Sequence, residues 1–231
     1  MRSVVAEGTG SALLLAAVVG SGIMGERLAA GNIAVALLAN TIATGAALAA
    51  LILTFGPVSG AHFNPVVTIA DASQGGLPWR AVPGYLVAQM AGAISGVLAA
   101  HAMFGERLFM LSAHERSGGA QMFSEFVATF GLVSVIRGCA RTRAAVVPFA
   151  VAAYIVAAYW FTASTSFANP AVSVARAFTD TFAGIRPADV PGFVMGQCLG
   201  GGAATLLFRW LVPAQPAGAD EIAAPREQAP V

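Results

Sequence analysis

The sequence is organised around a stretch that occurs twice, first as Ser59-Gly60-Ala61-His62-Phe63-Asn64-Pro65-Val66 and again as Ser164-Thr165-Ser166-Phe167-Ala168-Asn169-Pro170-Ala171. Each copy follows a long apolar run and leads into a short apolar segment. Asn is a preferred helix N-cap because its side-chain oxygen accepts an otherwise unpaired backbone N–H. Pro suits the first helical position because it has no N–H to satisfy. Each Asn-Pro pair therefore predicts the start of a helix.

The helices that begin at Asn64 and Asn169 are too short to cross a membrane. Each has an apolar segment of roughly ten residues, at 66–73 and 171–179, whereas a hydrocarbon core requires about twenty. We therefore expect two half-spanning, re-entrant helices, one in each half of the chain. Half-helices that end near the middle of the membrane are a common way to build a solute site there.

The composition indicates an integral membrane protein. The 231 residues are 57% hydrophobic and 10% charged, whereas soluble domains carry about 25% charged residues. The net charge of +1 offers no clustered basic surface, so nucleic acid is not an expected partner. Gly56-Pro57 is expected to end the second span, because Pro cannot continue a helix. Six spans are expected, near 4–24, 33–55, 82–104, 121–139, 144–165 and 188–211.

The two halves of the chain match each other. The pattern Glu7-x-x-Gly10-Ser11 corresponds to Glu125-x-x-Ala128-Thr129, and the two Asn-Pro pairs correspond in the same way. Because each half has three spans, the halves must enter the membrane with opposite orientation, which makes an inverted repeat. We expect one channel domain over residues 1–212, with repeats at about 1–104 and 121–212, and a disordered tail over 213–231.

Basic residues predict the orientation. Arg137, Arg141 and Arg143 cluster between the fourth and fifth spans, and positively charged loops favour the cytoplasmic side. Both termini are then cytoplasmic, and the expected location is the inner (plasma) membrane.

The two Asn-Pro boxes, six spans and inverted repeat together resemble the aquaporin, or major intrinsic protein, family over nearly the whole chain. The resemblance implies an all-α, aquaporin-like membrane protein, six transmembrane helices plus two re-entrant ones, with a pore in each protomer of a homotetramer. It further implies passive conduction of water or small neutral solutes in a lipid membrane, and no cofactor. The implied pore boxes are Asn64, Pro65, Val66, Asn169, Pro170 and Ala171.

Further roles follow from the same resemblance. The carbonyls of Gly60, Ala61, His62, Ser166, Phe167 and Ala168 would form a ladder of hydrogen-bond acceptors along the lumen. Irregular backbone at membrane depth is tolerated where it lines such a cavity. The intramembrane carboxylates Glu7 and Glu125 would accept N–H groups of the re-entrant loops.

The expected constriction departs from the family pattern. Most members place Arg directly after the second box, where this chain has Val172, and glycerol facilitators follow it with Asp, where this chain has Ser173. The constriction positions aligned from the two boxes are Thr44, Ala157, Ser166 and Val172. All are small or apolar, which predicts a wide constriction without its fixed cation.

Two points of this alignment stay open. The fifth span is uniformly apolar, so Tyr154 or Tyr159 could face the pore in place of Ala157 and narrow it. Arg176, one helical turn after Val172, either reaches back to replace the missing charge or pairs with Asp180.

A bacterial aquaporin subgroup associated with arsenic-resistance genes is similar in having an apolar residue in place of the Arg. This likeness implies arsenite and other metalloid hydroxy acids, glycerol-like solutes and organoarsenicals as the solutes. The alternatives are an ordinary water and glycerol channel and a non-conducting structural membrane protein. An enzyme or a metal site is not expected, because His62, His101 and His114 have no Cys, Glu or Asp at ligand spacing.

Overall fold

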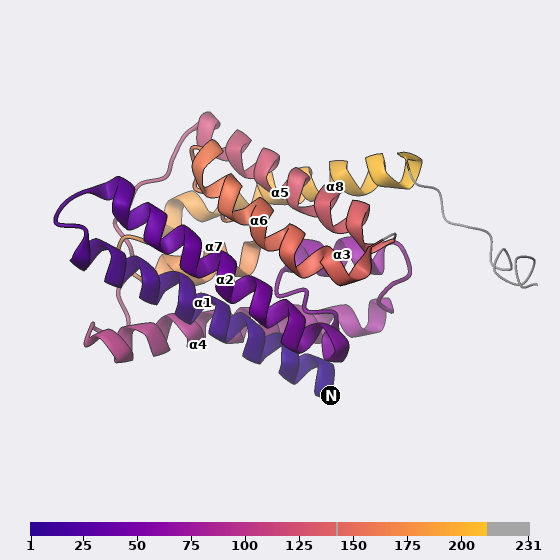
Figure 1. Ribbon diagram of the computed structural model, residues 1–231, viewed down its shortest axis with the longest axis horizontal. Coiled ribbons are helices and arrows are strands. Elements are labelled where there is room, and N and C mark those ends of the chain that lie inside the picture. Colours follow the sequence, from indigo (N-terminus) through magenta and orange to yellow (C-terminus); the bar gives the residue numbers. More distant parts are fainter. Residues whose placement is uncertain (142, 212–231) are drawn as a thin grey trace, which may run out of the picture.

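The computed structural model describes residues 1–141 and 143–211, and this part of the chain is helical, with no strand (Figure 1). The predicted tail over 213–231 lies outside the described residues. The α-helices are α1 (Arg2–Leu28), α2 (Ile33–Ser59), α3 (Pro65–Ala72), α4 (Val82–Phe104), α5 (Gly119–Ala140), α6 (Val147–Phe161), α7 (Pro170–Ala175) and α8 (Val190–Leu211). Short 3-10 turns are η1 (Trp79–Ala81), η2 (Ala144–Val146), η3 (Arg176–Phe178) and η4 (Pro187–Asp189).

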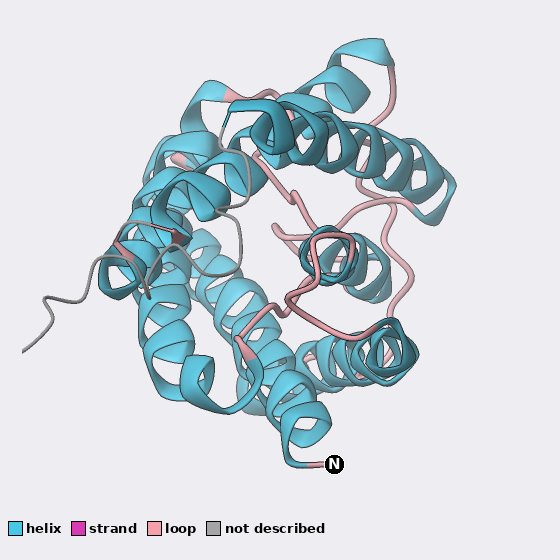
Figure 2. Ribbon diagram, turned by 90° about the vertical axis from the view of Figure 1, so that its right-hand side faces the viewer, coloured by secondary structure: helices cyan, strands magenta, loops and turns pink. Residues whose placement is uncertain are grey.

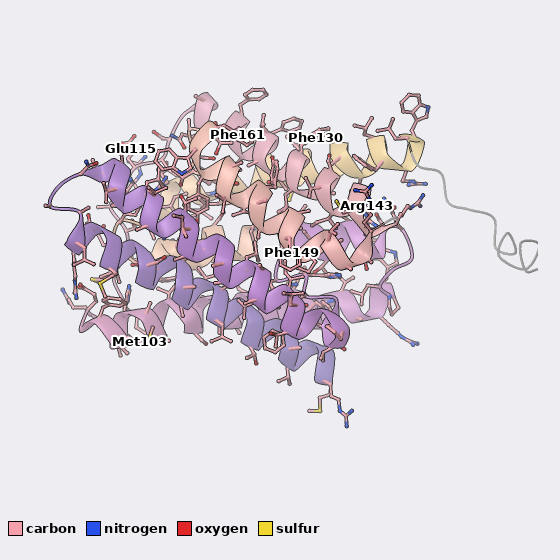
Figure 3. All side chains as sticks on the ribbon, viewed as in Figure 1. Met103, Glu115, Phe130, Arg143, Phe149 and Phe161 are labelled. Atoms are coloured by element: carbon pink, nitrogen blue, oxygen red, sulfur yellow. The ribbon has the colours of Figure 1, made fainter. Side chains whose placement is uncertain are left out.

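The described chain contains six helical segments that are long and apolar enough to cross a membrane. Large apolar side chains cover their outer faces: Met103, Phe149 and Phe161, labelled in Figure 3, are 67%, 57% and 56% exposed. Such a surface is stable against lipid and unfavourable in water. The protein is therefore a multi-pass membrane protein, as predicted.

The long helices enclose the two short ones. Viewed along the bundle, they form a ring around a short helix and its loops (Figure 2). α1 packs mainly against α4, and α5 packs in the same way against α8. Each short helix crosses to the other half of the chain, because α3 contacts α8 and α7 contacts α4. This arrangement is that of an inverted repeat with two half-helices meeting inside the bundle.

Glycines allow the paired long helices to touch. A Cβ added at Gly96 of α4 would collide with the Ala12 carbonyl oxygen of α1. A Cβ added at Gly200 of α8 would collide in the same way with the Phe126 carbonyl oxygen of α5. Small residues at such contacts let two membrane helices approach at backbone distance.

Three helix ends differ from the sequence prediction. α1 continues past residue 24 to Leu28, and the Ala29 N–H closes its last turn by donating to the Gly25 carbonyl at 2.9 Å. α2 continues through Pro57 to Ser59, because Pro removes only one N–H and Gly60 (φ 87°) closes the last turn by donating to the Gly56 carbonyl at 2.9 Å. α6 ends at Phe161 and not at Thr165. Thr162 is extended (φ −109°, ψ 138°), because there the chain leaves the helix to form the second re-entrant loop.

Candidate functional site

The two Asn-Pro pairs begin the short helices in the same way. The Asn64 Oδ1 atom accepts the Val66 N–H at 2.9 Å, and the Asn169 Oδ1 atom accepts the Ala171 N–H at 3.0 Å. Both Asn residues have extended backbone, and a Pro follows each at the first helical position. The local geometry is thus the N-cap that the sequence predicts.

The same two Asn side chains tie the re-entrant loops together. The Asn64 Nδ2 atom donates to the Ala168 carbonyl at 2.7 Å, and the Asn169 Nδ2 atom donates to the Phe63 carbonyl at 2.7 Å. An amide nitrogen carries two hydrogens, so each Asn keeps one N–H beyond this cross-loop bond. Both residues line a cavity, into which that second donor can be offered.

The two loops share an unusual backbone conformation. Ala61 (φ 50°) corresponds to Ser166 (φ 50°), and Phe63 (φ 48°) corresponds to Ala168 (φ 49°). Left-handed conformations of non-Gly residues cost about 1–3 kcal/mol each and persist only where the surroundings hold them. The pattern therefore requires strong anchors, and in each loop a buried carboxylate supplies them.

Glu7 anchors the first loop. Its Oε1 atom accepts from the Ser59 hydroxyl at 2.7 Å and the His62 N–H at 2.9 Å. Its Oε2 atom accepts from the Phe63 N–H at 2.7 Å and from Nε2 of Gln89 at 2.7 Å. Among the described residues, four donors and no acceptor are bonded to the group, which suits an ionised carboxylate.

Glu125 anchors the second loop with equivalent partners. Its two oxygens accept from the Phe167 N–H at 2.9 Å and the Ala168 N–H at 2.8 Å. Gln197 donates to the same carboxylate and to Ser173, as Gln89 donates to Glu7 and to Thr68. Both Glu side chains are fully buried. A buried ion satisfied by several N–H donors is a rigid brace.

Both Asn residues line a cavity of about 390 Å³. Of the residues expected at the pore boxes, Asn64 and Asn169 line it, whereas Val66 packs away from it against α8. Gly201 of α8 leaves room there, because a Cβ on it would collide with Val66. The six residues of the expected carbonyl ladder all line the cavity: Gly60, Ala61, His62, Ser166, Phe167 and Ala168.

The residue expected at the constriction from the fifth span, Ala157, does not line the cavity. Thr44, Ser166 and Val172 line the cavity, but Ala157 is exposed on the outer surface of α6. Tyr159 lines the cavity instead, and its hydroxyl lies 3.4 Å from the Thr44 hydroxyl. The reason is the rotation of α6, which turns Ile155 and Tyr159 inward and Ala157 outward. The cavity is therefore aromatic on this side, which is the alternative that the sequence left open.

Charged residues stand at both ends of the cavity, and neither Asp71 nor Arg137 is among the residues that the sequence predicts to line it. At one end Asp71 lies 3.8 Å from Arg137 and 3.7 Å from His62. At the other end Arg176 borders the cavity, and it lies as far beyond Asn169 as Asp71 lies beyond Asn64. Because Arg176 is already a candidate from the sequence, this shared spacing is the signal that could have identified Asp71 as well.

Comparisons with known proteins agree with this geometry. Residues 1–147 match the family described as major intrinsic protein. The aquaglyceroporin AqpS of Rhizobium meliloti is 55% identical over 216 residues, which cover 93% of this chain and 92% of that protein. Nodulin-26 of Glycine max is 41% identical over 119 residues, 47% of this chain and 41% of that protein.

A solved structure shows the same fold. The X-ray structure of the aquaglyceroporin from Plasmodium falciparum superposes with a TM-score of 0.72 at 19% identity, covering 92% of this chain and 97% of that one. The predicted all-helical, aquaporin-like fold is confirmed. With its two Asn-Pro boxes, paired re-entrant loops and 55% identity to a full-length relative, the chain belongs to the major intrinsic protein family, whose members are channels and not enzymes.

Proposed function

We propose that this protein is a passive channel for small neutral solutes, among them glycerol-like polyols and metalloid hydroxy acids such as arsenous acid. The observation that carries the proposal is the cavity of about 390 Å³, which is lined by Asp71 near one end, by both Asn residues at the centre and by Arg176 near the other. The extensive identity to the aquaglyceroporin AqpS supports the solute class.

The lining of the cavity suits a solute that has both hydroxyl groups and an apolar side. Thr44, Tyr159 and Ser166 bring hydroxyl groups to it, and Val172 brings an apolar surface. The Ser166 hydroxyl is buried and has no hydrogen-bond partner among the described residues. Pockets of this kind bind through apolar contact and orient the ligand by a few polar groups. We assign the constriction to Thr44, Tyr159, Ser166 and Val172.

The centre of the pore acts on the solute through hydrogen bonds. The second N–H of Asn64 and of Asn169 donates to a solute oxygen, while carbonyls of the two loops accept its hydroxyl hydrogens. Because Ala168 already accepts from Asn64, its carbonyl contributes less to this ladder than the five others. No step of this passage requires a cofactor or a chemical reaction.

Charge placement supports an orientation in the membrane. Arg143 lies at one end of the bundle and Glu115 at the opposite end (Figure 3). The N-terminus lies at the Arg143 end (Figure 1), and we place this end in the cytoplasm of a bacterial inner membrane. We call the Glu115 end the outer end. The test is a C-terminal fusion to a reporter that is active only outside the cytoplasm. Activity of that reporter would contradict this placement.

The proposed assembly is a homotetramer of 1–212 channel domains, each with its own pore. Exposed apolar residues on the outer helix faces are available to lipid and to neighbouring protomers. Native mass spectrometry in mild detergent tests the assembly, and a monomer alone would contradict it.

The decisive experiment is stopped-flow permeability of proteoliposomes to water, glycerol and neutral arsenous acid, with wild type and Val172→Arg. We expect wild type to pass all three and the variant to lose the two larger solutes selectively, because a long cationic side chain would fill the constriction. If both proteins pass water alone, the protein is a water channel. If neither passes any solute, it is the non-conducting structural protein.

A further inference from the structure

Arg176 occupies an unusual place for a charged side chain. It begins η3 directly after α7, is 2% exposed and borders the cavity one helical turn beyond Val172. Its guanidinium carbon lies 3.4 Å from the ring centre of Phe167, and its Nε atom donates to the Ala183 carbonyl. The stacking on Phe167 and the bond through Nε hold the guanidinium group at the edge of the lumen.

The terminal nitrogens of Arg176 lack partners within the described part of the chain. Among the residues that the structure describes, neither Nη1 nor Nη2 makes a hydrogen bond or an ion pair. Asp180, the partner that the sequence suggests, instead accepts the Ala113 N–H at 2.9 Å. Glu125 attracts this cation but makes no ion pair with it. A buried cation without a close partner is costly unless something else solvates it. The side of Arg176 that lacks partners is the side available to the lumen and its contents.

Arg116 stands beside it from the loop between α4 and α5. Its guanidinium carbon lies 5.1 Å from the same Phe167 ring centre, and its Nε atom donates to the Gly184 carbonyl at 2.8 Å. Its Nη1 atom donates to the Ser164 carbonyl at 3.3 Å. Burial lowers the pKa of Arg116 to about 10, so the group remains protonated at neutral pH. The outer end of the cavity therefore holds two positive charges close to one aromatic ring.

The inner end of the cavity, which faces the Arg143 end of the bundle, carries a different set of charges although the two halves of the chain repeat. Asp71 occupies the corresponding position beyond the first box, and Arg137 and His62 lie within 4 Å of it. The charge at the inner end is thus largely balanced by its neighbours. At the outer end neither Arg116 nor Arg176 makes an ion pair with another described residue, and Glu125 attracts both from beyond ion-pair distance.

We propose that Arg176, with Arg116 behind it, is the selectivity cation of this channel, set one helical turn nearer the outer mouth than the apolar position Val172. Its unpaired N–H groups bind oxygen atoms of an entering solute, and its charge repels cations. A planar guanidinium presents two parallel donors, which suits a solute with two neighbouring oxygens. A fixed positive charge beside a narrow pore excludes sodium ions and protons. This inference rests on the proposed channel function.

The test compares Arg176→Gln with wild type in proteoliposomes. We expect sodium and proton leak to rise about tenfold or more, the effect of removing one unit charge a few ångströms from a water-filled path. Formate, a two-oxygen anion, should slow glycerol entry into wild-type vesicles and should not affect the variant. Arg176→Lys keeps the charge and loses the fork, so it should keep the low leak and lose most of the formate effect.

Arg27→Gln is the matched control. Arg27 also lies at the outer end, but it is exposed and paired with Glu106 at 2.8 Å, so its removal should leave leak and formate sensitivity unchanged. Equal leak in wild type and Arg176→Gln would overturn the inference. If Arg176→Gln does not fold, wild type alone decides, because glycerol entry insensitive to formate excludes the site. Absence of any glycerol flux in wild type would instead count against the channel proposal.

Discussion

The carboxylate of Glu7 offers the sharpest test of how the pore is held open. Glu7→Gln keeps the size and shape of the side chain but replaces one acceptor oxygen by an NH₂ group. Four donors now meet the carboxylate, two at each oxygen. The cheapest arrangement puts the new NH₂ group where Oε1 was, because the Ser59 hydroxyl can turn to accept from it. The His62 N–H then has no partner.

The cost follows from counting these bonds. One buried N–H without a partner costs about 1–3 kcal/mol, and the two bonds kept at the other oxygen lose about 1 kcal/mol each with the charge. The total is about 3 to 5 kcal/mol, comparable with the strain of about 1–3 kcal/mol at each of the left-handed residues Ala61 and Phe63. The first re-entrant loop should therefore relax, and the cavity beside Asn64 should close.

Thermal unfolding in detergent and glycerol flux in proteoliposomes check this together. We expect a fall in Tm of about 6 °C or more for a chain of this size, with loss of most of the flux. The control is Glu106→Gln, which breaks an exposed ion pair with Arg27 and should cost less than about 1 kcal/mol. A Glu7→Gln protein with wild-type Tm and wild-type flux would refute the anchoring role.

Three further predictions follow from local geometry. Asn169→Asp keeps the helix cap but loses the amide donor to the opposite loop, so it should lower stability to thermal unfolding in detergent by about 1–3 kcal/mol. The control Asn32→Asp changes a cap without such a bond and should leave stability nearly unchanged. Gly96→Ala adds a methyl group that collides with a carbonyl of α1, and should cost about 1–3 kcal/mol, whereas Gly202→Ala meets open space and should not destabilise. Burial and nearby positive charge lower the pKa of His114. Its stabilising contribution is therefore present above about pH 6.5 and is lost as the pH falls through the folded-state pKa. Tm measured from pH 8 to pH 5 should fall less in His114→Gln than in wild type, and parallel curves for the two proteins would contradict this.

The starts of the two re-entrant helices could be predicted from local sequence. Asn-Pro pairs specify the starts of α3 and α7 because cap chemistry acts over two or three residues. The intramembrane carboxylates Glu7 and Glu125 could be identified as functional candidates because an isolated charge in an apolar helix needs partners. Their specific partners required the folded chain, since Gln89 and Gln197 are brought to them from other helices.

The sequence by itself determined the membrane class, the six spans and the inverted repeat, because these depend on composition, period and matched motifs. Only the tertiary structure decided which side chains meet the solute. A small rotation of α6 puts Tyr159 at the cavity and Ala157 on the outer surface, and a uniformly apolar helix contains no signal for that rotation. Likewise, only the folded chain shows that Arg176 stacks on Phe167 while Asp180 binds the Ala113 N–H. Helix register and long-range contacts arise from packing, which acts between segments distant in the chain.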